Sequence, residues 1–156
     1  MSGTIWGQED TDNICRGEAQ MIKAIVKDQF FLRQKSDPAA RDDLSVADDL
    51  QDTLNANRDR CVGMAANMIG VRKRVIIVNT GSQNEVMFNP EIIKKSGEFE
   101  TEEGCLSLPG TRKTLRYQEI LVEYRDRAWN KRRKQYSGWT AQIIQHECDH
   151  LDGILI

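Results

Sequence analysis

The two histidines of this 156-residue chain stand four residues apart, in the segment Gln145-His146-Glu147-Cys148-Asp149-His150-Leu151. On a helix, residues four apart return to the same face one turn higher, so His146 and His150 are expected to point together. Two neutral imidazoles bind a divalent metal ion, and the glutamate between them can take the proton of an attacking water. The alternative is a pair of exposed or merely hydrogen-bonded histidines, but the use of both histidines here favours a metal site.

A catalytic metal of this kind needs a third protein ligand and keeps one position open. Cys105 is the best candidate, because the segment Glu103-Gly104-Cys105-Leu106-Ser107 is followed by a proline and a glycine, so that a strand or turn can approach the helix. Cys148 is the alternative, although it would have to leave the apolar side of the helix. A thiolate with two imidazoles suits Fe(II), Zn(II), Co(II) or Ni(II).

The helix that carries the histidines is expected over residues 139–151, after Gly138. Its apolar residues recur at spacings of three, four and three, which predicts a core-facing stripe. The members of this stripe are Ala141, Ile144, Cys148 and Leu151. The pattern therefore predicts a helix with one buried side and one chemical side that carries His146, Glu147 and His150.

The rest of the chain shows helical and then strand patterns. Helical spacing is seen over residues 14–26, running into 29–32, and again over 44–57. Strands are expected at 75–78, 85–88, 114–117, 120–124 and 134–137, with a turn over 125–133. Two helices, several antiparallel strands and a last helix predict an α+β fold, formed as one domain over residues 1–156.

Composition excludes several function classes. The formal net charge is −2, so the chain has no global basic field and DNA is not an expected partner. No apolar run approaches eighteen residues, and the acidic N-terminal segment resembles neither a signal peptide nor an anchor, so a cytoplasmic protein without membrane contact is expected. The cysteines Cys15, Cys61, Cys105 and Cys148 are expected to be thiols.

The segments 103–107 and 145–151 resemble the second and third motifs of the peptide deformylase family, and the resemblance is clearest over residues 44–156. It implies antiparallel strands around a central H-E-x-x-H helix. It also implies a hydrolase that removes the N-formyl group from the N-terminal methionine of nascent peptides, a step of protein biosynthesis. The substrate would then be an N-formylmethionyl peptide.

The resemblance also implies residue roles. One divalent metal ion, Fe(II) in vivo with Zn(II), Ni(II) or Co(II) able to replace it, would be held by Cys105, His146 and His150. Glu147 would move a proton from the attacking water to the leaving amine, and the backbone N–H of Leu106 would support the oxyanion. Asp149 would either pair with Arg116 or remain a solvated carboxylate.

The family's first motif, Gly-x-Gly-x-Ala-Ala-x-Gln, corresponds here to Cys61-Val62-Gly63-Met64-Ala65-Ala66-Asn67-Met68. Gly63, Gly104 and Met68 are expected at the substrate. The family's glutamine donates to the oxyanion, which Met68 cannot do, and loss of such a donor costs about 10²–10³ in turnover. Asn67 could turn its amide toward the metal, but a turn or surface position is the preferred interpretation. Cys61 is either an oxidation-prone thiol near the metal or the result of a relaxed backbone requirement.

These departures support a second hypothesis, a deformylase-like metal-binding protein with weak or no activity that binds a peptide or partner. A zinc protease would leave the segment 103–107 unexplained. A transient ribosome contact is also considered, through the basic residues Arg125, Arg127, Lys131, Arg132, Arg133 and Lys134. Such runs at a turn are usually just solvated.

Overall fold

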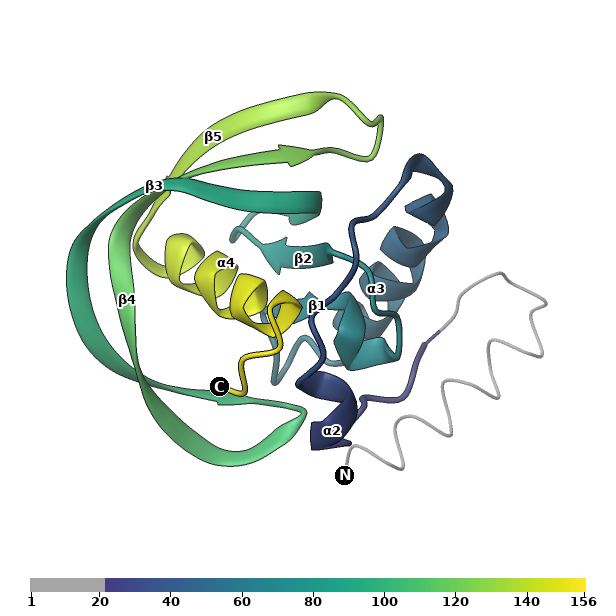
Figure 1. The fold of residues 1–156 in the computed structure, drawn as a ribbon, viewed down its shortest axis with the longest axis horizontal. Coiled ribbons are helices and arrows are strands. Elements are labelled where there is room, and N and C mark those ends of the chain that lie inside the picture. The colour runs from purple at the N-terminus through teal and green to yellow at the C-terminus, as the bar shows by residue number, and fades with distance from the viewer. Residues whose placement is uncertain (1–21) are drawn as a thin grey trace.

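A computed structural model describes residues 22–156 of the chain (Figure 1). Its helices are α2 (Gln29–Leu32), α3 (Leu44–Ala56) and α4 (Gly138–Leu151), with two short 3₁₀ helices, η1 (Arg41–Asp43) and η2 (Ala66–Ile69). Its strands are β1 (Gly63–Ala65), β2 (Val75–Asn79), β3 (Asn84–Cys105), β4 (Leu108–Arg125) and β5 (Lys131–Ser137). The predicted α+β class is confirmed.

The five strands form one antiparallel sheet in the order β1-β2-β3-β4-β5. The long strands β3 and β4 pair as a ribbon that arcs around α4 (Figure 1). Their register shifts at three places, and such irregularities bend a strand. One of the shifts lies between Gly104 and Cys105, so the ribbon turns where it delivers Cys105 to the helix.

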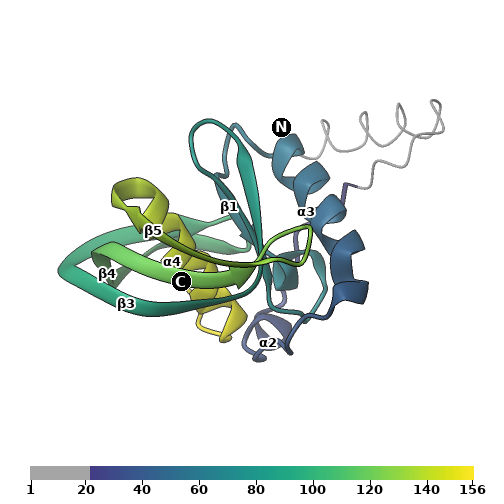
Figure 2. The same cartoon turned by 90° about the horizontal axis from the view of Figure 1, so that it is seen from above.

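Strand β2 is buried on both faces, which explains its uninterrupted apolar run. Because side chains alternate along a strand, Val75 and Ile77 pack into the cluster that contains the apolar face of α3. Ile76 and Val78 pack into a second cluster with the apolar stripe of α4. Viewed from above, α3 lies at one end of the molecule and the β3–β4 ribbon at the other (Figure 2).

The helix α4 is buried nearly all round, which the sequence did not predict. Its apolar stripe, Ala141, Ile144, Cys148 and Leu151, lies in the core as expected. The opposite side is also covered, because the β3–β4 ribbon wraps over it (Figure 1). His146 is 8% exposed, Glu147 4% and His150 0%. The side chains on the predicted chemical side of this helix therefore lie in a largely dehydrated environment.

The prediction of a first helix over residues 14–26 is wrong for residues 22–26, which is the part of it that the structure describes. Residues 14–21 lie outside the described residues, and residues 22–28 have no regular secondary structure. Their backbone bonds to distant elements instead: the Lys23 N–H donates to Thr53 Oγ1 at 3.0 Å, and the Val26 N–H donates to the Met68 carbonyl at 2.7 Å. Only α2 is helical, and Asp28 caps it. Tertiary hydrogen bonds here override the helical spacing.

The strands were predicted too short. The segment 85–88 opens β3, and the segments 114–117 and 120–124 belong to the single strand β4. The segment 134–137 is the end of β5, which already begins at Lys131 within the expected turn. Much of the ribbon is exposed and polar, so it lacks the alternation by which a strand is recognised. The length of the ribbon is therefore visible only from the backbone pairing of β3 with β4.

Candidate metal centre

Three side chains meet where the end of β3 touches α4. Cys105 Sγ lies 3.3 Å from His150 Nε2, and the two histidine Nε2 atoms lie 3.1 Å apart. One donor atom from each of Cys105, His146 and His150 can be chosen so that all lie within 4.8 Å of one another. One thiolate and two imidazoles that face a common point suit a divalent transition metal with an open position. Cys148 lies outside this group, in the core.

The two histidines differ in their proton affinity when no metal is present. Burial would lower the pKa of His146, but its hydrogen bonds with Cys105 and Glu103 raise it to about 10. Burial and the nearby charge of His146 lower the pKa of His150 to about 3. A metal ion bound by both Nε2 atoms requires both of these atoms to be unprotonated.

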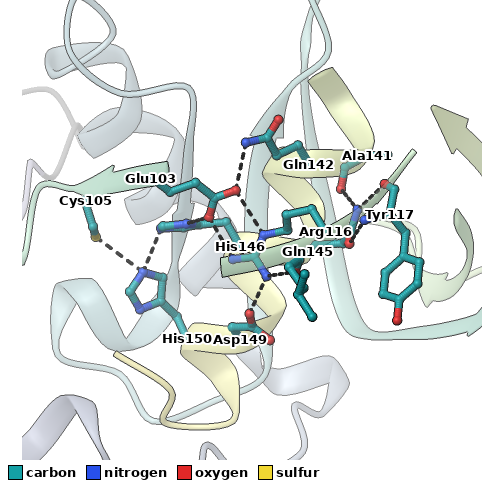
Figure 3. A network of polar contacts seen from close by, with 11 residues as sticks. Glu103, Cys105, Arg116, Tyr117, Ala141, Gln142, Gln145, His146, Asp149 and His150 are labelled. Atoms are coloured by element: carbon teal, nitrogen blue, oxygen red, sulfur yellow. Dashed lines mark hydrogen bonds and ion pairs between the residues drawn. The ribbon is translucent and has the colours of Figure 1, made fainter. Parts of the chain in front are cut away.

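Glu103 connects the metal centre to the ribbon (Figure 3). Its Oε1 accepts from His146 Nδ1 at 2.7 Å and from Arg116 at 2.7 Å, and its Oε2 accepts from Arg116 and from Gln142 Nε2 at 2.8 Å. Burial opposes ionisation of this carboxyl, but the hydrogen bonds from His146, Arg116 and Gln142 lower its pKa to about 2. Glu103 therefore stays charged and orients the His146 ring.

Arg116 joins both sides of this network. Besides Glu103, its guanidinium donates to Asp149 Oδ2 at 2.7 Å, so the pairing alternative for Asp149 is the correct one. Gln145 adds a clamp in which its amide exchanges two hydrogen bonds of 2.8 Å with the backbone of Tyr117. No role had been predicted for Glu103, although period-two alternation places it on the same face of β3 as Cys105.

Glu147 is the buried acid beside the ligands. Burial raises its pKa to about 7, against the lowering effect of the nearby His146 charge. Its Oε1 has no hydrogen-bond partner among residues 22–156. A Cβ on Gly63 would lie 2.6 Å from Ile143 Cγ2 and 3.1 Å from Glu147 Oε2. The glycine is thus needed for the close approach of α4 to β1.

A cleft of about 750 Å³ opens beside the ligand cluster. Its lining includes Cys105 and His146, two of the three candidate ligands, together with Glu147. Gly63, Gly104 and Met68, which were predicted at the substrate, also line it, as does Leu106, the predicted oxyanion donor. The structure thus gathers residues from β1, η2, the β3–β4 turn and α4 around one cavity.

The two departures from the family motif lie at the wall formed by β1 and η2: Met68 is part of η2, and Cys61 lies just before β1. Met68 is 1% exposed and packs into the α3 cluster while it lines the cleft. The Cys61 thiol donates to the Gly63 carbonyl at 2.8 Å. Burial, and then the charge of Glu147, raise the pKa of Cys61 to about 12. Cys61 is therefore a thiol rather than a reactive thiolate.

Asn67 lies in the short 3₁₀ helix η2 but is buried, so the surface position in the preferred interpretation was wrong. Its side chain has no exposed area, and its Nδ2 donates to the His150 carbonyl at 2.8 Å. A surface position was expected because asparagine is common in turns. The amide instead adds a second hydrogen bond to the His150 carbonyl, which also accepts from the Gly153 N–H at 3.0 Å.

The basic residues around the β4–β5 turn are largely neutralised. Arg127 pairs with Asp48, Arg132 with Asp126, Arg133 with Glu123 and Lys134 with Glu85.

Among residues 22–156, no helix has both the length and the apolar character that a membrane span requires.

Comparison with known proteins agrees with this geometry. A family model described as polypeptide deformylase matches residues 22–156. A peptide deformylase of Clostridium beijerinckii is 57% identical over 136 residues, which is 87% of this chain and 100% of the relative. A peptide deformylase of Acinetobacter baumannii solved with Met-Ala-Ser bound is 31% identical with a TM-score of 0.77, covering 86% of this chain and 97% of that one.

A crystal structure of a peptide deformylase from Legionella pneumophila is 33% identical, with a TM-score of 0.76, and covers 86% of this chain and 83% of that one. The match therefore extends to the whole described fold and includes the cysteine and histidine cluster. The chain belongs to the polypeptide deformylase family.

Proposed function

We propose that this chain is a metal-dependent hydrolase that removes the formyl group from the N-terminal methionine of nascent peptides. The observation that carries the proposal is the cluster of half-buried Cys105 with buried His146 and His150, beside Glu147 at the wall of a cleft. A divalent metal held by these three side chains would act as a Lewis acid on the formyl carbonyl.

The chain's own residues would perform the proton transfers. Glu147 takes a proton from the attacking water and gives it to the leaving amine, as the formyl C–N bond breaks to release formate and a free N-terminus. A pKa near 7 suits both roles. The backbone N–H of Leu106 supports the developing oxyanion. Gly63, Gly104 and Met68 contact the substrate.

The native metal is proposed to be Fe(II), with Zn(II), Ni(II) or Co(II) able to replace it, because one thiolate and two imidazoles suit all four ions. The enzyme is proposed to work in the cytoplasm as one domain. A cytoplasmic location fits the free thiols of Cys61, Cys105 and Cys148.

A second function is favoured by one observation. Met68 occupies the position of the oxyanion-binding glutamine and packs into the α3 cluster, so it offers no donor. A chain with an intact metal site and a weakened transition-state site would bind peptide and turn it over slowly. Retention of Glu147 beside Gly63 argues for catalysis, because a pure binding site needs no proton carrier.

The deciding experiment is turnover of formyl-Met-Ala-Ser by protein purified without oxygen and loaded with Fe(II), Ni(II) or Zn(II). The matched variant is Glu147→Ala, which leaves all three proposed ligands in place. We expect turnover in the wild type and a loss of about 10²–10⁴ in the variant, with equal metal content. A wild type that binds one metal and yields no formate would instead establish the binding protein.

A transient ribosome contact through the basic residues around the β4–β5 turn is also proposed. Four of these side chains already pair with carboxylates, so we expect weak, salt-sensitive binding. Cosedimentation with ribosomes at low and at physiological salt would detect it. Binding that persists when Lys131, Arg132 and Arg133 are changed to serine would place the contact elsewhere.

A further inference from the structure

The two histidines of the candidate metal centre are supported unequally. A metal-bound histidine almost always donates its second ring N–H to a carboxylate, a carbonyl or water, which fixes its tautomer and orientation. For His146 this partner is Glu103, 2.7 Å from Nδ1. His150 is fully buried, and its Nδ1 has no partner within the described part of the chain.

A matching acceptor lies on the residue that already touches His150. Asn67 Nδ2 donates to the His150 backbone carbonyl at 2.8 Å. The other end of the same amide, Oδ1, is buried and also lacks a partner among residues 22–156. Two buried polar atoms without partners, which are costly, therefore belong to residues in direct contact. Asn67 Oδ1 is an acceptor, and His150 Nδ1 is a donor in the tautomer that leaves Nε2 free for a metal.

We propose that Asn67 is the positioning residue for His150: Nδ2 holds the backbone of His150, and Oδ1 accepts its Nδ1–H when Nε2 takes the metal. The proposal rests on the metal site described under the proposed function. Asn67 is not part of the cleft lining, so it acts on the reaction only through His150. It would do for His150 what Glu103 does for His146, with a neutral amide in place of a carboxylate.

The first test is NMR of the Zn(II)-loaded protein labelled with ¹⁵N-histidine. The chain has only two histidines, so four ring nitrogens are observed. We expect two Nδ1–H protons that exchange slowly with water. In Asn67→Ala the proton of His150 should be lost to fast exchange, whereas that of His146, held by Glu103, should remain as an internal control. A His150 proton that exchanges fast in the wild type would overturn the proposal.

The second test is Zn(II) affinity by competition with a chelator. Asn67→Ala should bind Zn(II) about 10–100-fold more weakly, the usual effect of losing such a partner. The matched control is Asn57→Ala. Asn57 is also buried and donates to a helical carbonyl, that of Thr53, at 2.8 Å, but it contacts no proposed ligand. It should change neither the Zn(II) affinity nor the histidine signals.

The variant Asn67→Asp separates positioning from simple packing. It keeps an acceptor for the His150 Nδ1–H and removes the donor to the His150 carbonyl. We expect it to restore the slow His150 proton and most of the Zn(II) affinity. An Asp variant as weak as Ala would reduce Asn67 to a structural tie and overturn the proposal. A wild type that binds no Zn(II) would instead refute the metal site itself.

Discussion

The two sides of the cleft hold their functional residues by different physical means. On the ligand side, formed by the β3–β4 ribbon and α4, Glu103 and Arg116 are buried ions that neutralise each other, and Glu103 orients His146. On the opposite wall, formed by β1 and η2, Gly63 and Met68 contribute backbone and apolar contacts. The candidate ligand His146 and the Met68 wall are thus held by separate sets of contacts, so one set can be changed while the other is kept.

The sharpest test of this separation is Met68→Gln. An amide at this position should restore the oxyanion donor and raise deformylase turnover by up to about 10²–10³, with unchanged metal content. Met68→Leu is the control, because it keeps the apolar packing and adds no donor. Formate release under saturating substrate would be measured. Equal rates in the wild type and both variants would mean that the wall does not limit catalysis.

On the ligand side, we expect Glu103→Ala to weaken metal binding and to lower stability. His146 loses its Nδ1 partner, so the Zn(II) affinity should fall about 10–100-fold. Arg116 keeps only Asp149, and breaking a buried ion pair should lower the free energy of unfolding by about 3 kcal/mol. Chelator competition and urea unfolding measure the two effects. Glu103→Gln, which keeps the shape, should lose less of both; a fully stable Ala variant would contradict the role given to this ion pair.

A smaller effect is expected where the two sides touch. In Gly63→Ala the new methyl would meet Ile143 and Glu147, so the free energy of unfolding should fall by about 1–3 kcal/mol and turnover should fall more than metal affinity. Gly104→Ala is the matched control, because a Cβ there would lie 3.4 Å from the nearest atom, the Gly110 carbonyl oxygen. Thermal unfolding of both variants would show whether close approach of α4 requires the first glycine alone.

The smallest effect is expected at Glu85, whose carboxylate lies in a hydrogen-bond network away from the candidate metal centre. Glu85 accepts hydrogen bonds from Tyr124, Tyr136 and Lys134, and none of these side chains is a proposed ligand. Burial opposes ionisation of Glu85, but these hydrogen bonds lower its pKa below the ordinary 4.5. Its contribution to stability is therefore present above about pH 4.5 and is lost as the pH falls through the lower, folded-state pKa.

Glu85→Gln should accordingly cost about 1–2 kcal/mol of unfolding free energy at pH 7 and progressively less below pH 4.5, with no change in Zn(II) affinity. Urea unfolding of the variant and the wild type between pH 7 and pH 3 would measure this difference. A difference that stays constant with pH would show that the charge of Glu85 is not what stabilises the cluster.

The two candidate histidine ligands and the helix that carries them follow from the sequence alone. His146 and His150 share a helical face by their spacing, and α3 and α4 end close to where their apolar periodicity ends. The short apolar run of β2 is also recognised from the sequence, because a run of β-branched residues bounded by turn residues is typical of a buried strand. Local patterns are enough wherever the geometry is set by neighbours along the chain.

Only the tertiary structure decided the surroundings of those ligands. Cys105 reaches His150 because the β3–β4 ribbon curves, and its exposed polar residues carry no periodic signal for that curvature. Asn67 meets the His150 carbonyl across 83 positions of the chain. Residues 22–28 leave the predicted helix because distant acceptors, the Thr53 hydroxyl and the Met68 carbonyl, compete for their N–H groups. Contacts between segments far apart in the chain depend on how whole elements pack, and no local pattern of residue types encodes that packing.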